Sequence, residues 1–247
     1  MKYLFVGDIH NHLYMFKDVE KLDEQWNFDR IIFFGDYVDD WNTNNHHSLE
    51  TLDKVFELKR SNSNKYTFLL GNHELSYLGY KCSGHQYELE DVMEIKLKEN
   101  IDVFDLYTEV YTWDKGDFIC THAGLTNDFV ENVLGGDEWK QTLQLMNKDI
   151  LHNLKLLSMC SFRRGGNDRC SSFLWADRLE HYEIEEYIIP NQIVGHSPVK
   201  NITYNNGIYF IDTHSTYRNG STYGDNSYLM WWEDEFKLID NTLQIVE

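Results

Sequence analysis

The sequence predicts a mixed α/β (α+β) fold, with a parallel βαβ arrangement in its first half and a more antiparallel second half. Three short apolar runs, at 3–6, 30–34 and 66–70, are each followed by glycine and are typical of buried strands. Between them, apolar residues recur at helical spacing over 14–23 and 48–59. Because strands that alternate with helices form a parallel sheet, ligands are expected beyond the carboxyl ends of its strands.

The second half is predicted from short strands joined by tight turns. Two runs flank the turn residues 114–116 and indicate a hairpin, namely 107–113 and 117–121. Further strands are expected at 192–194, 207–212, 227–232 and 235–239.

Helical and loop segments separate these strands. Helices are predicted over 92–98 and, as one long amphipathic stretch, over 139–159. The segment 161–172 is rich in Gly, Arg and Ser and is expected to be a flexible connection. We therefore predict a single domain over residues 1–247, with a helical and loop insertion around 135–180.

Composition narrows the classes of function. A formal net charge of -19 opposes binding to nucleic acid phosphates and to anionic membrane surfaces. No apolar stretch approaches the roughly 18 residues of a membrane span, and the first apolar run is too short for a signal peptide. The four cysteines form no Cys-x-x-Cys pair, so we expect reduced thiols in a cytoplasmic protein. Composition does not predict the oligomeric state.

Five short polar blocks carry the chemistry. They are Gly-Asp-Ile-His at 7–10, Gly-Asp-Tyr-Val-Asp at 35–39, Gly-Asn-His-Glu at 71–74, Thr-His-Ala-Gly at 121–124 and Gly-His-Ser-Pro at 195–198. Asp, His and Asn are ligands suited to Mn, Fe or Zn, and one carboxylate can bridge two ions about 3.5–4 Å apart. Such a centre activates water against phosphate esters.

Each residue of these blocks also has an ordinary structural interpretation. Asp8 or Asp36 alone fits a helix N-cap after a strand, and Asn72 alone fits a turn. A single histidine would be an ordinary polar side chain. The order of the five blocks, each after an apolar run, is what favours a joint role.

The ordered blocks resemble the calcineurin-like metallophosphoesterases, in the branch of phosphoprotein phosphatases and bacterial diadenosine tetraphosphatases. The resemblance runs from Gly7 to about Gly224 and includes Phe-Ile-Asp-Thr at 210–213 and Tyr-Gly at 223–224. Gly-His-Ser-Pro lacks a second His two positions on and so differs from the Gly-His-x-His phosphodiesterases. The fold that the resemblance implies is a four-layer αββα sandwich of two mixed β-sheets, with metals at their upper edge.

The resemblance also implies a ligand set for two divalent ions, with manganese expected first and iron or zinc as alternatives. One ion would take Asp8, His10 and the bridging Asp36. The second would take Asp36 and three further side chains, which are Asn72, His122 and His196.

The mechanism that the resemblance implies is direct attack of a metal-bridging hydroxide on phosphorus. His73 would be the general acid that protonates the leaving oxygen. Asp39 would accept a hydrogen bond from the other ring nitrogen and so fix the orientation of His73.

One departure from the family pattern concerns phosphate binding. In the phosphoprotein phosphatases the block continues Arg-Gly, and that Arg clamps phosphate oxygens, whereas this chain has Asp40 and Trp41. Arg178 is the first candidate to replace it and Arg164 the second. Arg163 and Arg169 are further candidates. A surface ion pair with Asp177 or Glu180 is the competing interpretation for each of these arginines.

The function predicted is a metal-dependent phosphohydrolase acting on a phosphoprotein or a dinucleoside polyphosphate. Tyr37 and Trp41 flank the metal block and could stack on a nucleobase or phenyl ring. The alternative is a catalytically weak protein that retains its metals and binds phosphate or a partner, which Asp40 favours and His73 opposes. A third hypothesis, an acidic protein that imitates nucleic acid, explains the charge but none of the blocks.

Overall fold

The computed structural model describes residues 1–41, 46–80, 82, 85–113 and 116–246, so the predicted turn residues 114 and 115 lie outside the described residues. The first half contains the expected alternation of strands and helices: β1 (Tyr3–Val6), α1 (Tyr14–Trp26), β2 (Arg30–Phe33), α2 (His46–Ser61), β3 (Tyr66–Leu69), α3 (Asn72–Ser76), α4 (Glu90–Glu99) and β4 (Phe104–Asp105). β1 pairs with β2, and β2 with β3, in parallel register. The predicted parallel unit is therefore confirmed.

The second half supplies the other strands and helices, which are β5 (Thr108–Thr112), β6 (Gly116–Thr121), α5 (Asn127–Asn132), α6 (Trp139–Lys148), α7 (Leu154–Leu157), α8 (Arg178–Tyr182), β7 (Gln192–Val194), β8 (Thr203–Asn205), β9 (Ile208–Phe210), β10 (Tyr228–Trp232), β11 (Glu235–Ile239) and β12 (Ile245–Val246). The described strands form a seven-stranded sheet in the order β12-β11-β10-β1-β2-β3-β4 and a five-stranded sheet in the order β5-β6-β7-β9-β8. Both sheets are mixed, because β10 is antiparallel to β1, while β6, β7 and β9 run parallel next to the antiparallel β5.

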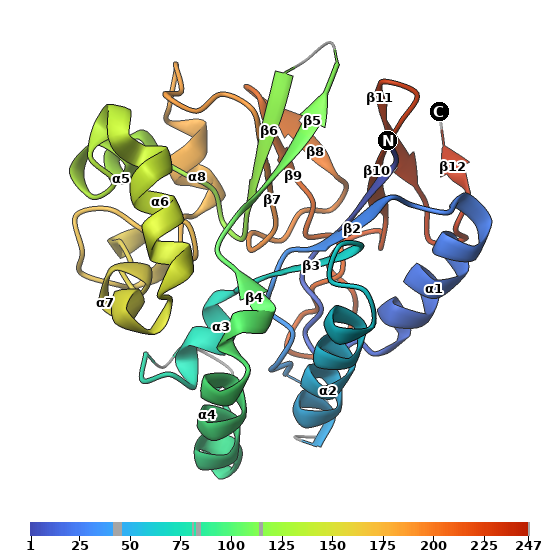
Figure 1. The fold of residues 1–247 in the computed structure, drawn as a ribbon, viewed down its shortest axis with the longest axis horizontal. Helices are drawn as coiled ribbons and strands as arrows, with labels where there is room; N and C mark the ends of the chain where they lie inside the picture. Colours follow the sequence, from blue (N-terminus) through green and yellow to red (C-terminus); the bar gives the residue numbers. More distant parts are fainter. Residues whose placement is uncertain (42–45, 81, 83–84, 114–115, 247) are drawn as a thin grey trace.

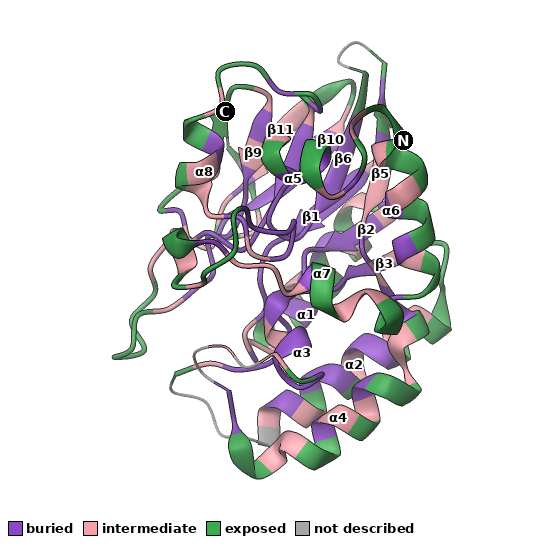
Figure 2. Ribbon diagram, turned by 90° about the vertical axis from the view of Figure 1, so that its left-hand side faces the viewer, coloured by how far each residue is buried: buried purple, intermediate pink, exposed green. Residues whose placement is uncertain are grey.

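Alternation along the central strands explains why the sheets stack. Leu4 and Phe33 point to one face of the larger sheet and pack in a cluster with the buried side of α1 and α2. Phe5 and Ile32 point to the other face and pack against residues of the smaller sheet such as Phe118. Helices α5 to α8 lie on the far side of the sheets from α1 and α2 (Figure 1). The central strands are accordingly buried and the outer helix faces exposed (Figure 2), which confirms the predicted sandwich of two mixed sheets.

Two predictions for the segment after β6 are wrong. The long helix expected over 139–159 breaks after α6, because Asp149 leaves helical geometry (φ -142, ψ 71) and its Oδ1 accepts the N–H of His152 at 3.1 Å. The segment 161–172 is a hydrogen-bonded loop rather than a loose connection. The N–H of Ser161 donates to Ser171 Oγ at 3.0 Å and so joins its two ends. The residue before it is bonded to its middle, because the N–H of Cys160 donates to Asp168 Oδ2 at 2.9 Å and the N–H of Asp168 donates to Cys160 O at 3.0 Å.

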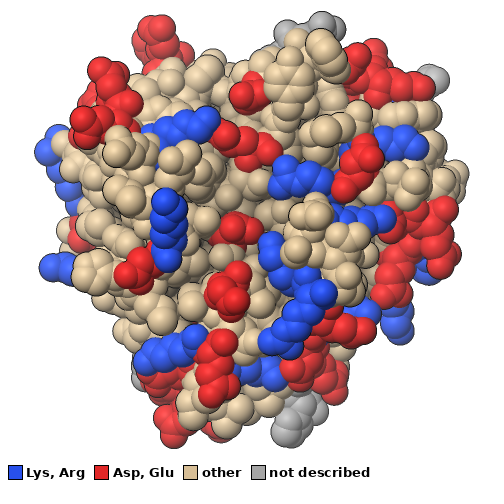
Figure 3. Space-filling view, viewed as in Figure 1, with Lys and Arg blue, Asp and Glu red and all other residues tan. Residues whose placement is uncertain are grey.

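The surface agrees with the composition. On the face shown in Figure 3, Lys and Arg side chains are interspersed with Asp and Glu. Among the described residues, no helix is both long and apolar enough to cross a membrane. All four cysteines lie in the described part of the chain, and their thiols are free.

Candidate metal centre

The six predicted metal ligands all follow strands that end at one edge of the two sheets. Asp8 and His10 come after β1, Asp36 after β2, and Asn72 begins α3 after β3. On the smaller sheet, the ligands after β6 and β7 are His122 and His196. Because these strands run parallel within each sheet, their carboxyl ends bring the six side chains together.

The backbone at this edge adopts conformations that most residues avoid. The φ angles of His10, Asp36 and His196 are 42, 49 and 61°. Non-glycine residues with positive φ are uncommon and persist where surrounding structure holds them. Gly35 has φ 103°, and a Cβ there would lie 2.8 Å from both Gly71 and His122 Nδ1. The sharp turn after β2 therefore needs glycine to bring Asp36 between its neighbours.

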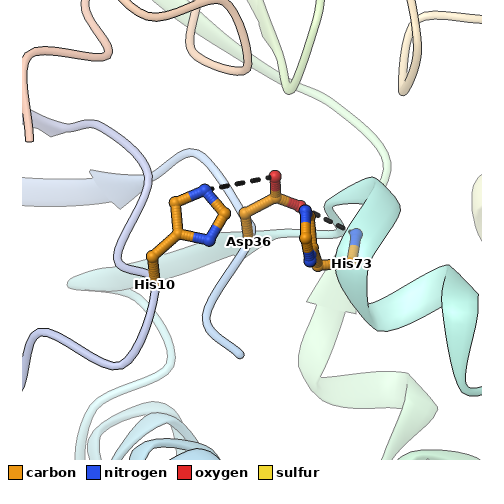
Figure 4. A group of neighbouring side chains, drawn as sticks. All are labelled: His10, Asp36 and His73. Atoms are coloured by element: carbon orange, nitrogen blue, oxygen red, sulfur yellow. Dashed lines mark hydrogen bonds and ion pairs between the residues drawn. The ribbon is translucent and has the colours of Figure 1, made fainter. Parts of the chain in front are cut away.

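Asp36 occupies the middle of the cluster. Its Oδ2 lies 3.8 Å from His10 Nε2 on one side and 3.5 Å from His122 Nε2 on the other. Asp8 Oδ2 lies 4.0 Å from the same His10 nitrogen. Figure 4 shows His10 and His73 on either side of the Asp36 carboxylate. One carboxylate thus contacts both halves of the predicted ligand set.

The ligand atoms around His122 lie closer to one another than those around His10. His122 Nε2 lies 3.0 Å from Asn72 Oδ1 and 3.1 Å from His196 Nδ1. The other ring nitrogen, Nδ1 of His122, is 2.5 Å from the carbonyl oxygen of Phe34 and donates its hydrogen there. In the neutral imidazole Nε2 carries a lone pair that faces the acceptor oxygen of Asn72, whereas in the protonated imidazole the Nε2–H donates to that oxygen. Acceptor atoms this close fit a shared cation.

The same arrangement recurs at His10. Its Nδ1 donates to the carbonyl oxygen of Asp39 at 2.8 Å, so its Nε2 presents a lone pair to the carboxylates of Asp8 and Asp36. Imidazole nitrogens and carboxylate or amide oxygens are ligands for divalent transition metals. The donor set therefore fits the two divalent ions predicted from the sequence.

Electrostatics favour cations in this buried cluster. Burial opposes ionisation of Asp36, yet the charges of His122 and His73 hold its pKa well below the usual value. Burial also opposes protonation of His122, but the Asp36 carboxylate raises its pKa to about 9. For Asp8, burial and the charge of Asp212 raise the pKa well above normal. A bound cation would offset the repulsion among these carboxylates.

His73 and Asp39 form a hydrogen-bonded pair beside this cluster. His73 Nδ1 lies 3.0 Å from Asp39 Oδ2, and the His73 backbone N–H donates to Asp36 Oδ1 at 2.9 Å. Burial lowers the pKa of His73, but the Asp36 charge, the Cys82 thiol and the Asp39 hydrogen bond together raise it well above normal. The hydroxyl of Tyr77 donates to the second oxygen of Asp39. His73 is therefore oriented by a carboxylate that is itself held in place.

Glu74 is a site residue that our sequence analysis missed. Its buried carboxylate accepts the backbone N–H groups of Asp36, Tyr37, Val38 and Gly71 at 3.1, 2.7, 3.2 and 3.0 Å. It thereby ties the loop after β2 to the start of α3. A signal was available, because Glu three residues after Gly71 is the position that closes a capping box. Tyr77 left no comparable signal, since its contact with Asp39 is tertiary.

The cluster opens into a cavity of about 610 Å³. Arg164 lines this cavity, and its Nε lies 2.7 Å from Asp177 Oδ2 while its Nη2 donates to Ser197 Oγ at 2.7 Å. Arg178 is not among the lining residues, and its Nη1 donates to the carbonyl oxygen of Pro198 at 3.3 Å. The structure therefore brings the second candidate arginine, and not the first, to the cavity wall.

Aromatic side chains and Asp40 complete the cavity wall, which includes Trp41, Tyr80 and Trp175. The stacking role suggested for Tyr37 is wrong, because its ring is fully buried in the core and its hydroxyl donates to Leu69 O at 2.7 Å. Asp40 Oδ1 accepts a hydrogen bond from Thr216 at 2.8 Å, and its Oδ2 is 3.8 Å from His12 Nε2.

Known proteins that resemble this chain are phosphohydrolases. A family model described as Calcineurin-like phosphoesterase matches residues 1–238. The chain is 27% identical over 235 residues to the bis(5'-nucleosyl)-tetraphosphatase PrpE (asymmetrical) of Bacillus cereus strain Q1. This match covers 86% of this chain and 85% of the relative. The chain is also 29% identical over 130 residues to the serine/threonine-protein phosphatase 6 catalytic subunit of Drosophila melanogaster. That match covers 50% of this chain and 40% of the relative.

Solved structures share the fold. A cold-active protein-tyrosine phosphatase of a psychrophilic Shewanella species matches with a TM-score of 0.66 at 14% identity, covering 99% of this chain and 79% of that one. A serine/threonine phosphatase from Saccharomyces cerevisiae, with similarity to human phosphatase PP5, matches with a TM-score of 0.57 at 15% identity, covering 93% and 72%. The resemblance inferred from the five blocks is confirmed, and the chain belongs to the calcineurin-like phosphoesterase family of metal-dependent phosphohydrolases.

Proposed function

We propose that this protein hydrolyses phosphate esters or anhydrides at a dinuclear metal centre. The observation that carries the proposal is the approach of His122 Nε2 to Asn72 Oδ1 and His196 Nδ1, at 3.0 and 3.1 Å, which brings three atoms able to bind a metal ion together. Asp36 would bridge that half to the half formed by Asp8 and His10. When bound, two divalent ions would lower the pKa of water and neutralise charge on phosphoryl oxygens.

Manganese is the first ion to test, with iron and zinc as alternatives, because the proposed ligands are carboxylates, imidazoles and one amide. A cytoplasmic location belongs to the same proposal and is supported by the free thiols of the four cysteines.

His73 is the proposed general acid. Its Nδ1 is held by Asp39, so its Nε2 remains to donate a proton to the leaving oxygen. The backbone N–H of His73 is bonded to Asp36, which fixes the imidazole relative to the proposed bridging carboxylate. Because His73 also lines the cavity, a substrate bound there would meet it directly.

Arg164 is the proposed phosphate-binding residue. Ser197 accepts a hydrogen bond from Nη2 and Asp177 forms an ion pair at Nε, so other N–H groups of the guanidinium can donate to phosphoryl oxygens. Ser197 directly follows the proposed ligand His196 in the chain, so the guanidinium is anchored next to the ligand set. A fixed cation at this place would stabilise charge as it develops on the phosphoryl group.

A dinucleoside polyphosphate is the proposed substrate class, and a phosphoprotein is the second candidate. The similarity to a tetraphosphatase spans 86% of this chain, whereas the similarity to a protein phosphatase spans 50%. The cavity also presents Trp41, Tyr80 and Trp175, whose rings can pack on a nucleobase.

The proposal is tested with protein that is stripped by a chelator and reloaded with Mn²⁺. Turnover of diadenosine tetraphosphate, phosphopeptides and p-nitrophenyl phosphate should be abolished by the chelator and restored by the ion. His73→Ala should lower kcat by about 10²–10⁴, and Asp36→Asn should remove activity. Asp53→Asn, on the surface of α2, is the matched control. Wild-type turnover by Asp36→Asn would overturn the proposal.

The same panel of substrates also tests the alternative, a binding protein that retains its metals. Asp40 favours this alternative because a carboxylate cannot clamp a phosphate. Turnover of none of the substrates, with Mn²⁺ shown to be bound, would support that alternative against hydrolysis.

A further inference from the structure

A second group of metal-binding side chains lies beside the proposed centre. One ligand atom each from Asp39, His73 and Cys82 lies within 4.8 Å of the others. His73 Nδ1 and Asp39 Oδ2 are 3.0 Å apart, and the Cys82 thiol contacts the His73 imidazole. All three residues line the cavity, so an ion from solvent can reach them.

We propose that Asp39, His73 and Cys82 form a separate zinc site whose occupation inhibits the enzyme. Zn²⁺ prefers four ligands in a tetrahedron, with bonds of about 2.0–2.3 Å to nitrogen, oxygen and sulfur. Donor atoms in such a tetrahedron are about 3.3–3.8 Å apart, so small side-chain shifts would close this group around the ion. Three protein ligands would leave the fourth position to water.

The sulfur ligand distinguishes this site from the proposed catalytic centre. The catalytic set consists of carboxylates, imidazoles and an amide, and contains no thiol. A thiolate favours Zn²⁺ over the harder Mn²⁺. Manganese-loaded protein would therefore keep the Asp39, His73 and Cys82 group open to zinc, and binding would release the thiol proton.

The position of His73 explains why zinc would inhibit. The ion would take the place of the proton between His73 Nδ1 and Asp39 Oδ2. With zinc on Nδ1, His73 would carry a proton only on Nε2. Donation of that proton would leave an imidazolate, so His73 would no longer serve as a general acid. Inhibition rests on the proposed role of His73 as general acid, whereas zinc binding does not. The His73 ring also lies next to His10 and Asp36, so zinc bound to this ring would act directly at the proposed centre (Figure 4).

Inhibition is measured by adding Zn²⁺ to Mn²⁺-loaded protein in three forms: wild type, Cys82→Ser and Cys160→Ser. Cys160 lines the same cavity, and the described residues place it in no three-donor group. We expect Cys82→Ser to need at least tenfold more Zn²⁺ for half inhibition and Cys160→Ser to behave as wild type. Equal inhibition of wild type and Cys82→Ser would overturn the inhibitory site, because zinc would then act by exchange in the catalytic centre.

Binding is measured independently of turnover with Co²⁺, which reports a thiolate ligand by a charge-transfer band in the near ultraviolet. Wild type and Cys160→Ser should show the band, and Cys82→Ser should lack it. Absence of the band in wild type, or its persistence in Cys82→Ser, would overturn the site. If no substrate is turned over, the proposed function fails, but the cobalt spectrum still decides whether Asp39, His73 and Cys82 bind metal. Thermal unfolding of each variant checks that it is folded.

Discussion

Replacement of Arg164 tests the proposed phosphate contact most directly. The guanidinium is fixed by Asp177 and Ser197, each at 2.7 Å, and it faces the same cavity as His73. Loss of one fixed donor to a developing oxyanion costs about 2.7–4 kcal/mol of transition-state stabilisation, which is about 10²–10³ in rate. We therefore expect Arg164→Ala to lower kcat/KM by at least about 100-fold.

Two further variants separate this effect from loss of charge or of folding. Arg178→Ala removes an arginine of the same region whose Nη1 is bonded to Pro198 O, and kcat/KM should stay within about threefold. Arg164→Lys keeps the charge but lacks the planar fork whose separate nitrogens face Asp177, Ser197 and the cavity, so its activity should fall between those of wild type and Arg164→Ala.

The assay compares kcat/KM of the Mn²⁺-loaded proteins for p-nitrophenyl phosphate and diadenosine tetraphosphate, with thermal unfolding as the folding control. The assignment is refuted if Arg164→Ala retains wild-type activity. If Arg178→Ala instead loses 100-fold, the phosphate contact belongs to the arginine that the sequence favoured first.

Three other outcomes are expected. His181 is buried, which lowers its pKa to about 4, so its contribution to stability is complete above pH 6.5 and is lost as the pH falls toward 4. Between pH 7 and pH 5 this amounts to about 2 kcal/mol, and chemical denaturation of His181→Gln should lack that part of the acid sensitivity. Glu74→Gln leaves an amide facing two of the four backbone N–H donors, so we expect a loss of about 3–6 kcal/mol in unfolding free energy, measured in urea. Mn²⁺ at about 100 times its Kd should stabilise the native protein by about 2.7 kcal/mol and raise Tm by about 5–10 °C, and a shift that persists after chelation would contradict metal binding.

Much of the fold could be predicted because the signals are local. β1 begins and ends where the apolar run at 3–6 does, and the helical periodicity located α1 and α2 to within a few residues. The ligand blocks were visible because each follows a strand end, and parallel pairing then brings those ends together. The four layers came from the family resemblance, since local periodicity does not specify how two sheets stack.

The misses are tertiary in origin. Apolar spacing continues past Asp149, because Ile150 and Leu157 still pack against the core, although the helix does not continue. Tyr37 adjoins a proposed ligand in sequence, yet the loop after β2 turns its ring into the core, where its hydroxyl donates to Leu69 O. Arg164 and Arg178 could not be ranked from the sequence, because the folded loop that presents Arg164 depends on contacts between Cys160 and Asp168.

Asp40 and Arg164 together indicate how a substrate would lie in the cavity. A carboxylate accepts hydrogen bonds and repels phosphoryl oxygens, so the part of the wall near Asp40 suits a hydroxyl or another donor group. Arg164 donates to anions, and it comes from the loop after α7 rather than from the loop after β2 that carries Asp40. The proposed phosphate contact, Arg164, therefore lies on a different loop from Asp40, which occupies the position where the family usually has its phosphate-binding Arg. This separation favours a substrate with a hydroxylated, uncharged portion beside its phosphates over a bare phosphate monoester, which supports a nucleotide before a phosphoprotein.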